Sequence, residues 1–253
     1  MKKLSISMAI VAACGLLATE SFAEETNYKV GLALEGSSAL YKADNHYDYL
    51  PYPILDLQYK NFYIEDLEAG VGFEVIDNLS VSGFITALDG QYISSSDMKK
   101  GYRSINKRNY QLSFGVGVEY DFDSLGLSDT TISYSFRGGK HGIIQRVDLS
   151  KTLPLSSSFV VGGSVGANFY NRVYSRYYYG VKKSELGGDI TKTYRPDASF
   201  SYDFLAWGDY QITDHFGLRA AITYEKFDKE VKNSPIVDDS YQLTYILGAY
   251  YAF

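Results

Sequence analysis

The carboxyl-terminal segment of the chain, residues 241–253, restricts its fold more than any other feature. Alternate positions there are apolar, the positions between them are mostly polar or small, and the chain ends on Phe253. The apolar positions are Tyr241, Leu243, Tyr245, Leu247, Ala249, Tyr251 and Phe253. Such a strand is typical of the closing strand of an outer-membrane β-barrel, whose strands are apolar toward lipid and polar toward the lumen. The pattern predicts where the protein resides more clearly than what it does there.

The same alternation recurs along the chain and is clearest in residues 110–122. Seven apolar positions alternate there with Gln, Ser, Gly, Glu and Asp. A helix would spread this pattern over every face, so the period indicates β-structure. Read in this way, the sequence predicts twelve strands: 28–37, 51–59, 62–66, 70–76, 79–89, 109–122, 130–137, 143–153, 159–171, 197–212, 216–227 and 240–253.

The lengths of the connections support this count. With the amino end in the periplasm, the long segments 38–50, 90–108, 172–196 and 228–239 all lie on the outer side. Bacterial barrels have short periplasmic turns and longer outer loops, and dropping one strand would put 90–108 and 172–196 on opposite sides. We therefore expect an all-β fold, a single transmembrane antiparallel β-barrel of about 12 strands, with 10 strands as the alternative.

The amino terminus has the features of a secretory signal. Lys2 and Lys3 precede a mostly apolar run, and Ser21-Phe22-Ala23 offers small residues at the two positions that a signal peptidase reads. The sequence predicts a cleaved signal peptide over residues 1–23 and an outer-membrane barrel domain over residues 24–253. A lipoprotein box ending at Cys14 is the alternative. Cys14 is the single cysteine, so a chain cut after Ala23 has no disulfide framework.

The composition is consistent with a barrel and excludes one class of partner. Mean hydropathy is −0.18, but alternation of lipid-facing and lumen-facing residues cancels in such an average. Aromatic residues make up 16% of the chain, with 25 Tyr, as expected for girdles at the membrane interfaces. A net charge of −6 argues against nucleic-acid binding.

Strand parity turns a set of charged side chains into the lumen, because charges facing lipid are costly. The acidic members are Glu35, Asp56, Glu119, Asp121, Asp148, Asp203, Asp209 and Glu225, and the basic members are Lys29, Arg137, Arg146 and Arg219. Two interpretations remain open: an ion-paired plug that fills a small barrel, or a narrow cation-preferring pore.

Candidate catalytic groups are few. His46 has Asp44 and Asp48 nearby in the sequence, His141 lies in a short Gly-rich loop, and His215 lies in a predicted periplasmic turn. A histidine base needs a fixed orienting partner, which flexible loops do not supply. No nucleophile elbow, metal-ligand spacing or phosphate-binding loop occurs. We expect no enzyme, no catalytic residue, no cofactor and no metal site, and we rank an outer-membrane hydrolase third.

Two predicted outer loops are rich in basic residues with tyrosines among them. Such clusters could pair with lipopolysaccharide phosphates or could be solvated. The first cluster is Lys99, Lys100, Arg103, Lys107 and Arg108. The second comprises Arg172, Arg176, Lys182, Lys183, Lys192 and Arg195, near Tyr174 and Tyr177–Tyr179.

Three segments of the chain stand out as motifs. They are Pro51-Tyr52-Pro53-Ile54-Leu55 with the following Tyr59 and Asn61-Phe62-Tyr63; Tyr178-Tyr179-Gly180-Val181 with Tyr194-Arg195-Pro196; and Ser234-Pro235-Ile236-Val237. In their order and spacing they resemble the MltA-interacting protein (MipA)/OmpV family of outer-membrane barrels. The departures from the family are the Tyr- and Lys-rich loop 172–196 and the basic loop 99–108, the segments expected to set a partner of this chain's own.

The resemblance implies a non-catalytic outer-membrane protein. It would act as an envelope scaffold for peptidoglycan-synthesising or -cleaving enzymes or as a surface adhesion protein, with a small cation-preferring channel as the alternative. It also implies that Tyr251 and Phe253 form the recognition signal for the barrel-assembly machinery. Outer-membrane lipid and lipopolysaccharide are the remaining expected partners.

Overall fold

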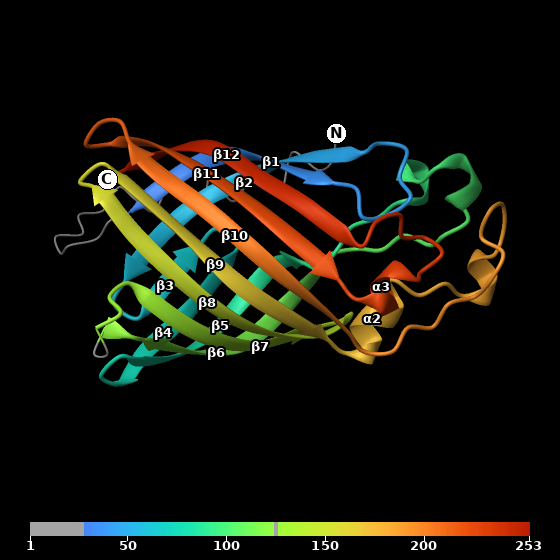
Figure 1. Cartoon of the computed structure of the whole chain (residues 1–253), viewed down its shortest axis with the longest axis horizontal. Helices are drawn as coiled ribbons and strands as arrows, with labels where there is room; N and C mark the ends of the chain where they lie inside the picture. Colours follow the sequence, from blue (N-terminus) through green and yellow to red (C-terminus); the bar gives the residue numbers. More distant parts are fainter. Residues whose placement is uncertain (1–27, 124–125) are drawn as a thin grey trace.

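The computed structural model describes residues 28–123 and 126–253, and within them the chain forms one closed barrel of antiparallel strands (Figure 1). The predicted signal peptide over residues 1–23, its cleavage site and Cys14 lie outside the described residues. The strands are β1 (Lys29–Ser38), β2 (Tyr47–Tyr59), β3 (Phe62–Glu65), β4 (Glu68–Ile76), β5 (Leu79–Asp89), β6 (Gln111–Asp121), β7 (Thr130–Gly139), β8 (Gly142–Ser156), β9 (Phe159–Tyr170), β10 (Ser199–Gln211), β11 (Phe216–Phe227) and β12 (Tyr241–Ala252).

The predicted fold and the count of twelve strands are confirmed, and the ten-strand alternative is wrong. Each strand pairs with its neighbours in sequence, and β1 pairs with β12 to close the barrel, with Lys29 opposite Ala252. Leu32 and Leu34 point outward and are more than half exposed, whereas Ala33 between them points inward and is buried. The observed faces therefore follow the alternation in the sequence.

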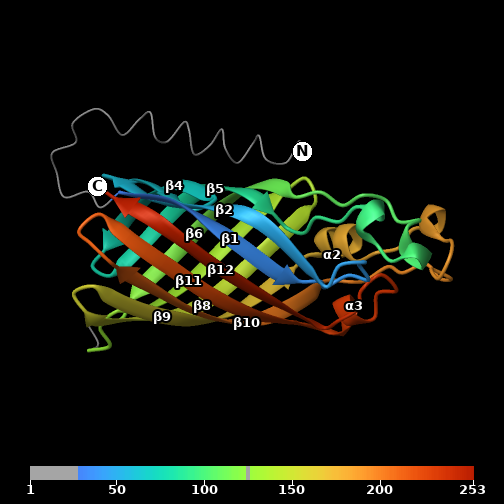
Figure 2. The same cartoon turned by 90° about the horizontal axis from the view of Figure 1, so that it is seen from above.

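The long connections all lie at one end of the barrel, together with the short β3–β4 and β7–β8 turns. The long connections contain the helices α2 (Arg172–Tyr178) and α3 (Lys229–Lys232) and the 3-10 turns η1 (Ser95–Asp97), η2 (Lys100–Tyr102) and η4 (Lys183–Glu185). Both views place α2 and α3 at the end away from the carboxyl terminus (Figures 1 and 2). Because long loops of bacterial barrels face outward, this is the outer end.

No helix in the described part of the chain is long and apolar enough to cross a membrane.

The β3–β4 hairpin is much shorter than its neighbours, so part of β2 has an open edge. Only residues 56–59 of β2 pair with β3. At the tip of the hairpin, the backbone N–H of Asp66 donates to the Leu55 carbonyl at 2.7 Å, and the Asp66 carboxylate accepts from the Leu55 N–H at 3.2 Å. Toward the outer end, the next residues of β2 that point to this edge are Pro53 and Pro51. Neither has an N–H, so neither leaves a donor unpaired.

This edge explains the largest error in the predicted boundaries. The sequence placed the start of the second strand at residue 51, whereas β2 begins at Tyr47. Proline ends a strand only where its missing N–H would have paired with a neighbour. Here Tyr52 and the other even-numbered residues of β2 bond to β1, and the prolines point to the side that has no partner strand.

Candidate functional site

The outer end of the barrel is covered by a loop cap, formed by residues 39–46, 90–110, 171–198 and 228–240. Its buried side chains form one hydrophobic cluster that rests on Ile144, Tyr170 and Phe227 at the ends of strands. The cap members of this cluster are Leu40, Tyr41, Ile93, Met98, Ile105, Tyr174, Tyr178, Tyr179, Val181, Ile190, Val231, Ile236 and Val237. Isolated bridges join the segments, including Tyr41 with Val237 and Ala43 with Met98. Four loops far apart in the sequence thus share one core.

Three tyrosines of the 172–196 loop, Tyr174, Tyr178 and Tyr179, are buried in the cap, so a role of this loop in setting a partner stays a prediction for its exposed residues. The Asn171 side chain caps α2 by accepting a hydrogen bond from the Tyr174 N–H at 2.9 Å. This start turns Tyr174 and Tyr178 inward, where they are 3% and 0% exposed. The Tyr41 hydroxyl donates to the Tyr178 carbonyl at 3.3 Å. The helix therefore places two large aromatic rings in the outer opening of the barrel.

A buried ion pair fastens two loops of the cap. Arg108 Nη1 lies 2.8 Å from Glu185 Oε1, and both side chains are almost wholly buried. Glu185 also accepts from the backbone N–H groups of Asn106 at 2.8 Å and Lys182 at 2.7 Å. Burial alone would raise the pKa of Glu185, but these three donors outweigh it and lower the pKa. The pair holds loop 90–110 against loop 171–198.

The basic residues predicted to contact lipopolysaccharide are placed differently from one another. Arg108 is buried in the pair with Glu185 and does not reach the surface. Lys99 is paired with Asp238 at 2.7 Å, and Arg103 with Asp44 at 2.6 Å. The ammonium of Lys107 lies 5.0 Å from the ring centre of Tyr92, and Lys100 is exposed. Lipopolysaccharide binding therefore stays a prediction for the four residues other than Arg108.

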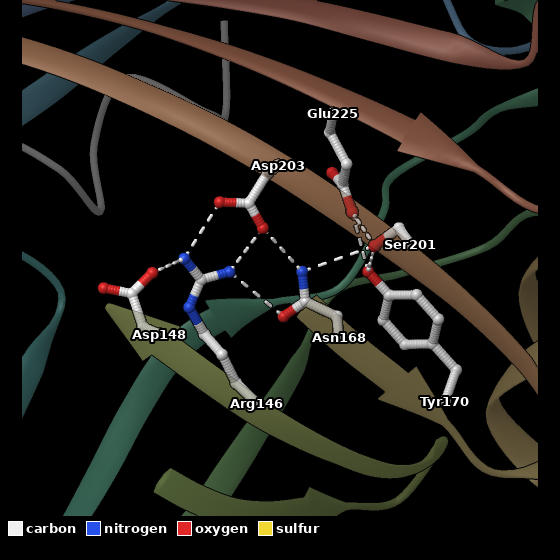
Figure 3. Close-up of polar contacts among 7 residues, drawn as sticks. All are labelled: Arg146, Asp148, Asn168, Tyr170, Ser201, Asp203 and Glu225. Atoms are coloured by element: carbon white, nitrogen blue, oxygen red, sulfur yellow. Dashed lines mark hydrogen bonds and ion pairs between the residues drawn. The ribbon is translucent and has the colours of Figure 1, made fainter. Parts of the chain in front are cut away.

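Beneath the cap, a polar network spans four strands of the lumen (Figure 3). Arg146 on β8 lies between Asp148 on the same strand, at 2.6 Å, and Asp203 on β10, with which it makes two bonds of 2.6 and 2.9 Å. Asn168 on β9 donates to Asp203 at 3.0 Å. On β11, Glu225 accepts from the hydroxyls of Tyr170 at 2.8 Å and Ser201 at 2.5 Å. The network consists of Arg146, Asp148, Asn168, Tyr170, Ser201, Asp203 and Glu225.

A glycine makes room for this network. Gly166 faces Asp148 on one side and Asp203 on the other. A Cβ at Gly166 would lie 2.4 Å from Nη2 of Arg146. Only a residue without a side chain lets the guanidinium cross β9 and join the two carboxylates.

A second group of ion pairs lies in the periplasmic half of the lumen. Lys29 on β1 lies 3.6 Å from Asp56 and 3.9 Å from Asp209, and Arg219 on β11 bonds Asp209 at 2.9 Å. Arg219 also approaches Asp66 at the tip of the short hairpin, at 3.9 Å. All four basic residues predicted to face inward thus pair with acidic residues inside the lumen, since Arg137 contacts Asp89 at 3.3 Å.

Strand parity does not predict that Asp89 faces the lumen, and the backbone of β5 explains why. Ser80, Ser82 and Thr86 of β5 face inward, so strict alternation turns residue 89 outward. The register shifts between Thr86 and Asp89, and Leu88 adopts a positive φ of 54°. This bulge turns Asp89 into the lumen, where it is 8% exposed. An alternating sequence pattern contains no signal that predicts a bulge of this kind.

The two candidate histidines of the outer loops differ in their surroundings. The ring of His141 is stacked on Tyr177, with 3.7 Å between ring centres, and His46 is exposed. Burial and the charge of Lys140 lower the pKa of His141. In the described residues neither imidazole has a hydrogen bond or ion pair with a carboxylate. No three His, Cys, Asp or Glu side chains of the described ranges are grouped to hold a metal ion.

The predicted assembly signal lies at the periplasmic rim. Tyr251 and Phe253 pack edge to face with ring centres 4.9 Å apart, and Phe253 is 57% exposed. The Phe253 N–H donates to the carbonyl of Tyr28 at 3.0 Å, next to the start of β1. These rings are accessible from the periplasm, and their recognition by the assembly machinery stays a prediction.

A closed antiparallel barrel that is apolar outside and charged inside is the construction by which strands cross a bilayer. The molecule is therefore an outer-membrane β-barrel protein. The model of the MltA-interacting protein MipA family matches residues 30–253, and the chain belongs to that family.

Its relatives are outer-membrane proteins. The 24 kDa outer membrane protein of Pasteurella multocida is 32% identical over 95% of this chain and 97% of its own length. The MltA-interacting protein of Escherichia coli is 22% identical over 100% and 99% of the two chains. Outer membrane protein Omp26La of Vibrio anguillarum is 26% identical over 76% and 75%. Among solved structures, the NanC porin aligns over 89% of this chain and 98% of its own, with a TM-score of 0.40 and 10% identity.

Proposed function

We propose that this barrel is a non-catalytic scaffold whose periplasmic rim holds an enzyme that cleaves or synthesises murein. A full-length relative bears the name MltA-interacting protein, which supports a partner of that class. The closed construction of the barrel carries the proposal. Its outer mouth is filled by a packed cap, and its lumen is lined by two sets of ion pairs. Such a barrel suits a rigid platform better than a passage.

The periplasmic rim consists of short turns that could position a partner together. Its turns lie between β2 and β3, β4 and β5, β6 and β7, β8 and β9, and β10 and β11. Asp77, Ser157 and Asp214 are exposed at the tips of three of them. Short turns offer little surface each, so we expect the partner to contact several at once.

Site-specific photocrosslinking tests the proposal. A photoreactive residue placed at Asp77, Ser157 or Asp214 in cells should yield adducts with a membrane-bound lytic transglycosylase or a murein synthase. The matched control is Lys183, which is exposed on the cap and should yield none. Adducts with such enzymes from Lys183 alone, or from none of the four positions, would contradict the proposal.

A further inference from the structure

The wall formed by β2, β3, β4 and β5 has a groove of about 560 Å³. Its floor contains Ala69 and Gly83, and its sides include Tyr28, Tyr59, Phe62 and Ile85. Phe62 and Ile85 are 63% and 43% exposed and belong to the outward face of the barrel. The groove is therefore open to lipid.

Two small residues on neighbouring strands create the groove. Gly83 of β5 faces Val71 on β4 and Val116 on β6, and a Cβ at Gly83 would meet no atom within 4 Å. Ala69 lies between Ile64 and Ile85 on the same face. Elsewhere in the wall, Phe114, Val116 and Val118 project outward, so the missing side-chain volume at Gly83 leaves a depression that an apolar chain can fill.

The groove has a polar mouth at the periplasmic end. Tyr59 and Phe62 flank the turn between β2 and β3, and Lys60 lies in that turn with its ammonium 5.3 Å from the ring centre of Tyr59. Lys60 is exposed and has no ion pair with any described residue. Aromatic rings and a free cation at this level lie where the phosphates of the periplasmic leaflet are found.

We propose that this groove is a binding site for one phospholipid of the periplasmic leaflet. One acyl chain lies over Gly83 and Ala69, and the phosphate is held by the ammonium of Lys60. Lysine binds phosphate as a point charge, and an acyl chain seated in the groove gains van der Waals contacts with its walls. Lipopolysaccharide does not fit the site, because the charged mouth opens at the periplasmic end and not at the outer end.

Native mass spectrometry of the detergent-solubilised, folded protein tests this site, with dioleoyl phosphatidylglycerol as the probe. We expect one tightly retained lipid on the wild type. Gly83→Leu should remove it, because the leucine occupies the groove and its Cβ meets no protein atom within 4 Å. Lys60→Glu should weaken it about fivefold, and Lys60→Arg should retain it. Ala220→Leu adds the same side chain to an exposed position on β11 and should bind like the wild type.

Folding of each variant is checked by its heat-modifiable electrophoretic mobility. Equal lipid retention by folded Gly83→Leu and the wild type would overturn the proposal. Equal lipid retention by Lys60→Glu and the wild type would also overturn it. Tighter retention of lipopolysaccharide than of phosphatidylglycerol at the same site would overturn it as well.

Discussion

At the scale of single residues, Glu185 is the side chain on which the cap depends most. It accepts hydrogen bonds from Arg108, Asn106 and Lys182 in a buried position, and the Arg108 Nε is the one buried side-chain polar atom without a partner in the described residues. Removing the carboxylate charge would leave a buried guanidinium uncompensated, at a cost of about 3 kcal/mol. By contrast, Arg103 and Asp44 form a half-exposed pair, which contributes about 0–1 kcal/mol.

We predict that Glu185→Gln loosens the cap and that acid does the same to the wild type. The folded state lowers the pKa of Glu185, so its contribution is complete above the ordinary value of 4.5 and is lost as the pH falls below it. Spin labels on cysteines at Lys100 and Lys183 report the distance between the two loops. The distribution should be narrow in the wild type at pH 7, broad once the pH is well below 4.5, and broad at both in Glu185→Gln. Asp44→Asn should stay narrow at pH 7; if it broadens like Glu185→Gln, the buried pair has no special role.

At the scale of elements, the open edge of β2 shows how the wall tolerates a short hairpin. A backbone N–H without a partner is costly both in lipid and in a buried position, and Pro51 and the buried Pro53 remove two such donors. Pro53→Ala should restore one of them and destabilise the barrel by about 1–3 kcal/mol. Urea unfolding in phosphatidylcholine vesicles measures this difference. Pro154→Ala, at the exposed periplasmic end of β8, controls for the effect of proline on the unfolded chain. Equal losses in the two variants would show that the edge has no special cost.

Strands were predictable from the sequence, whereas the cap was not. Alternation identifies a strand and its two faces, so Arg146, Asp203 and Glu225 could be placed in the lumen from parity alone. No periodic signal distinguishes a buried loop from a solvated one, so Tyr178 and Arg108 were grouped with exposed residues. The segments that resemble the family have structural roles. Pro51 and Pro53 lie at the open edge of β2. Tyr179, Ser234 and Ile236 are buried together in the cap, where the Ser234 hydroxyl donates to the Tyr179 carbonyl at 2.6 Å.

For the whole molecule, the cap and the two lumenal networks favour the plug over the cation-preferring pore. Ions passing along the axis would have to cross the cluster around Tyr178 and then pass lumenal charges that are already paired, such as Arg146 with Asp203. We therefore expect no discrete conductance steps from the refolded protein in planar bilayers. A cap-deleted variant lacking residues 172–196 tests whether the lumenal network alone is sufficient to block ions. Steps of reproducible size from the intact protein would restore the channel interpretation.

The cap also sets an order of events during biogenesis. Tyr41 follows the first strand and Val237 precedes the last, yet the two are bridged, and the Lys42 N–H donates to the Ile236 carbonyl at 3.0 Å. Contacts between segments so distant in the chain form only after the entropy of closing the intervening loop has been overcome. Pairing of β1 with β12 brings the two segments together and so overcomes this entropic cost. The outer segments must therefore cross the membrane unassembled and dock last, so a formed cap marks a barrel whose insertion is complete.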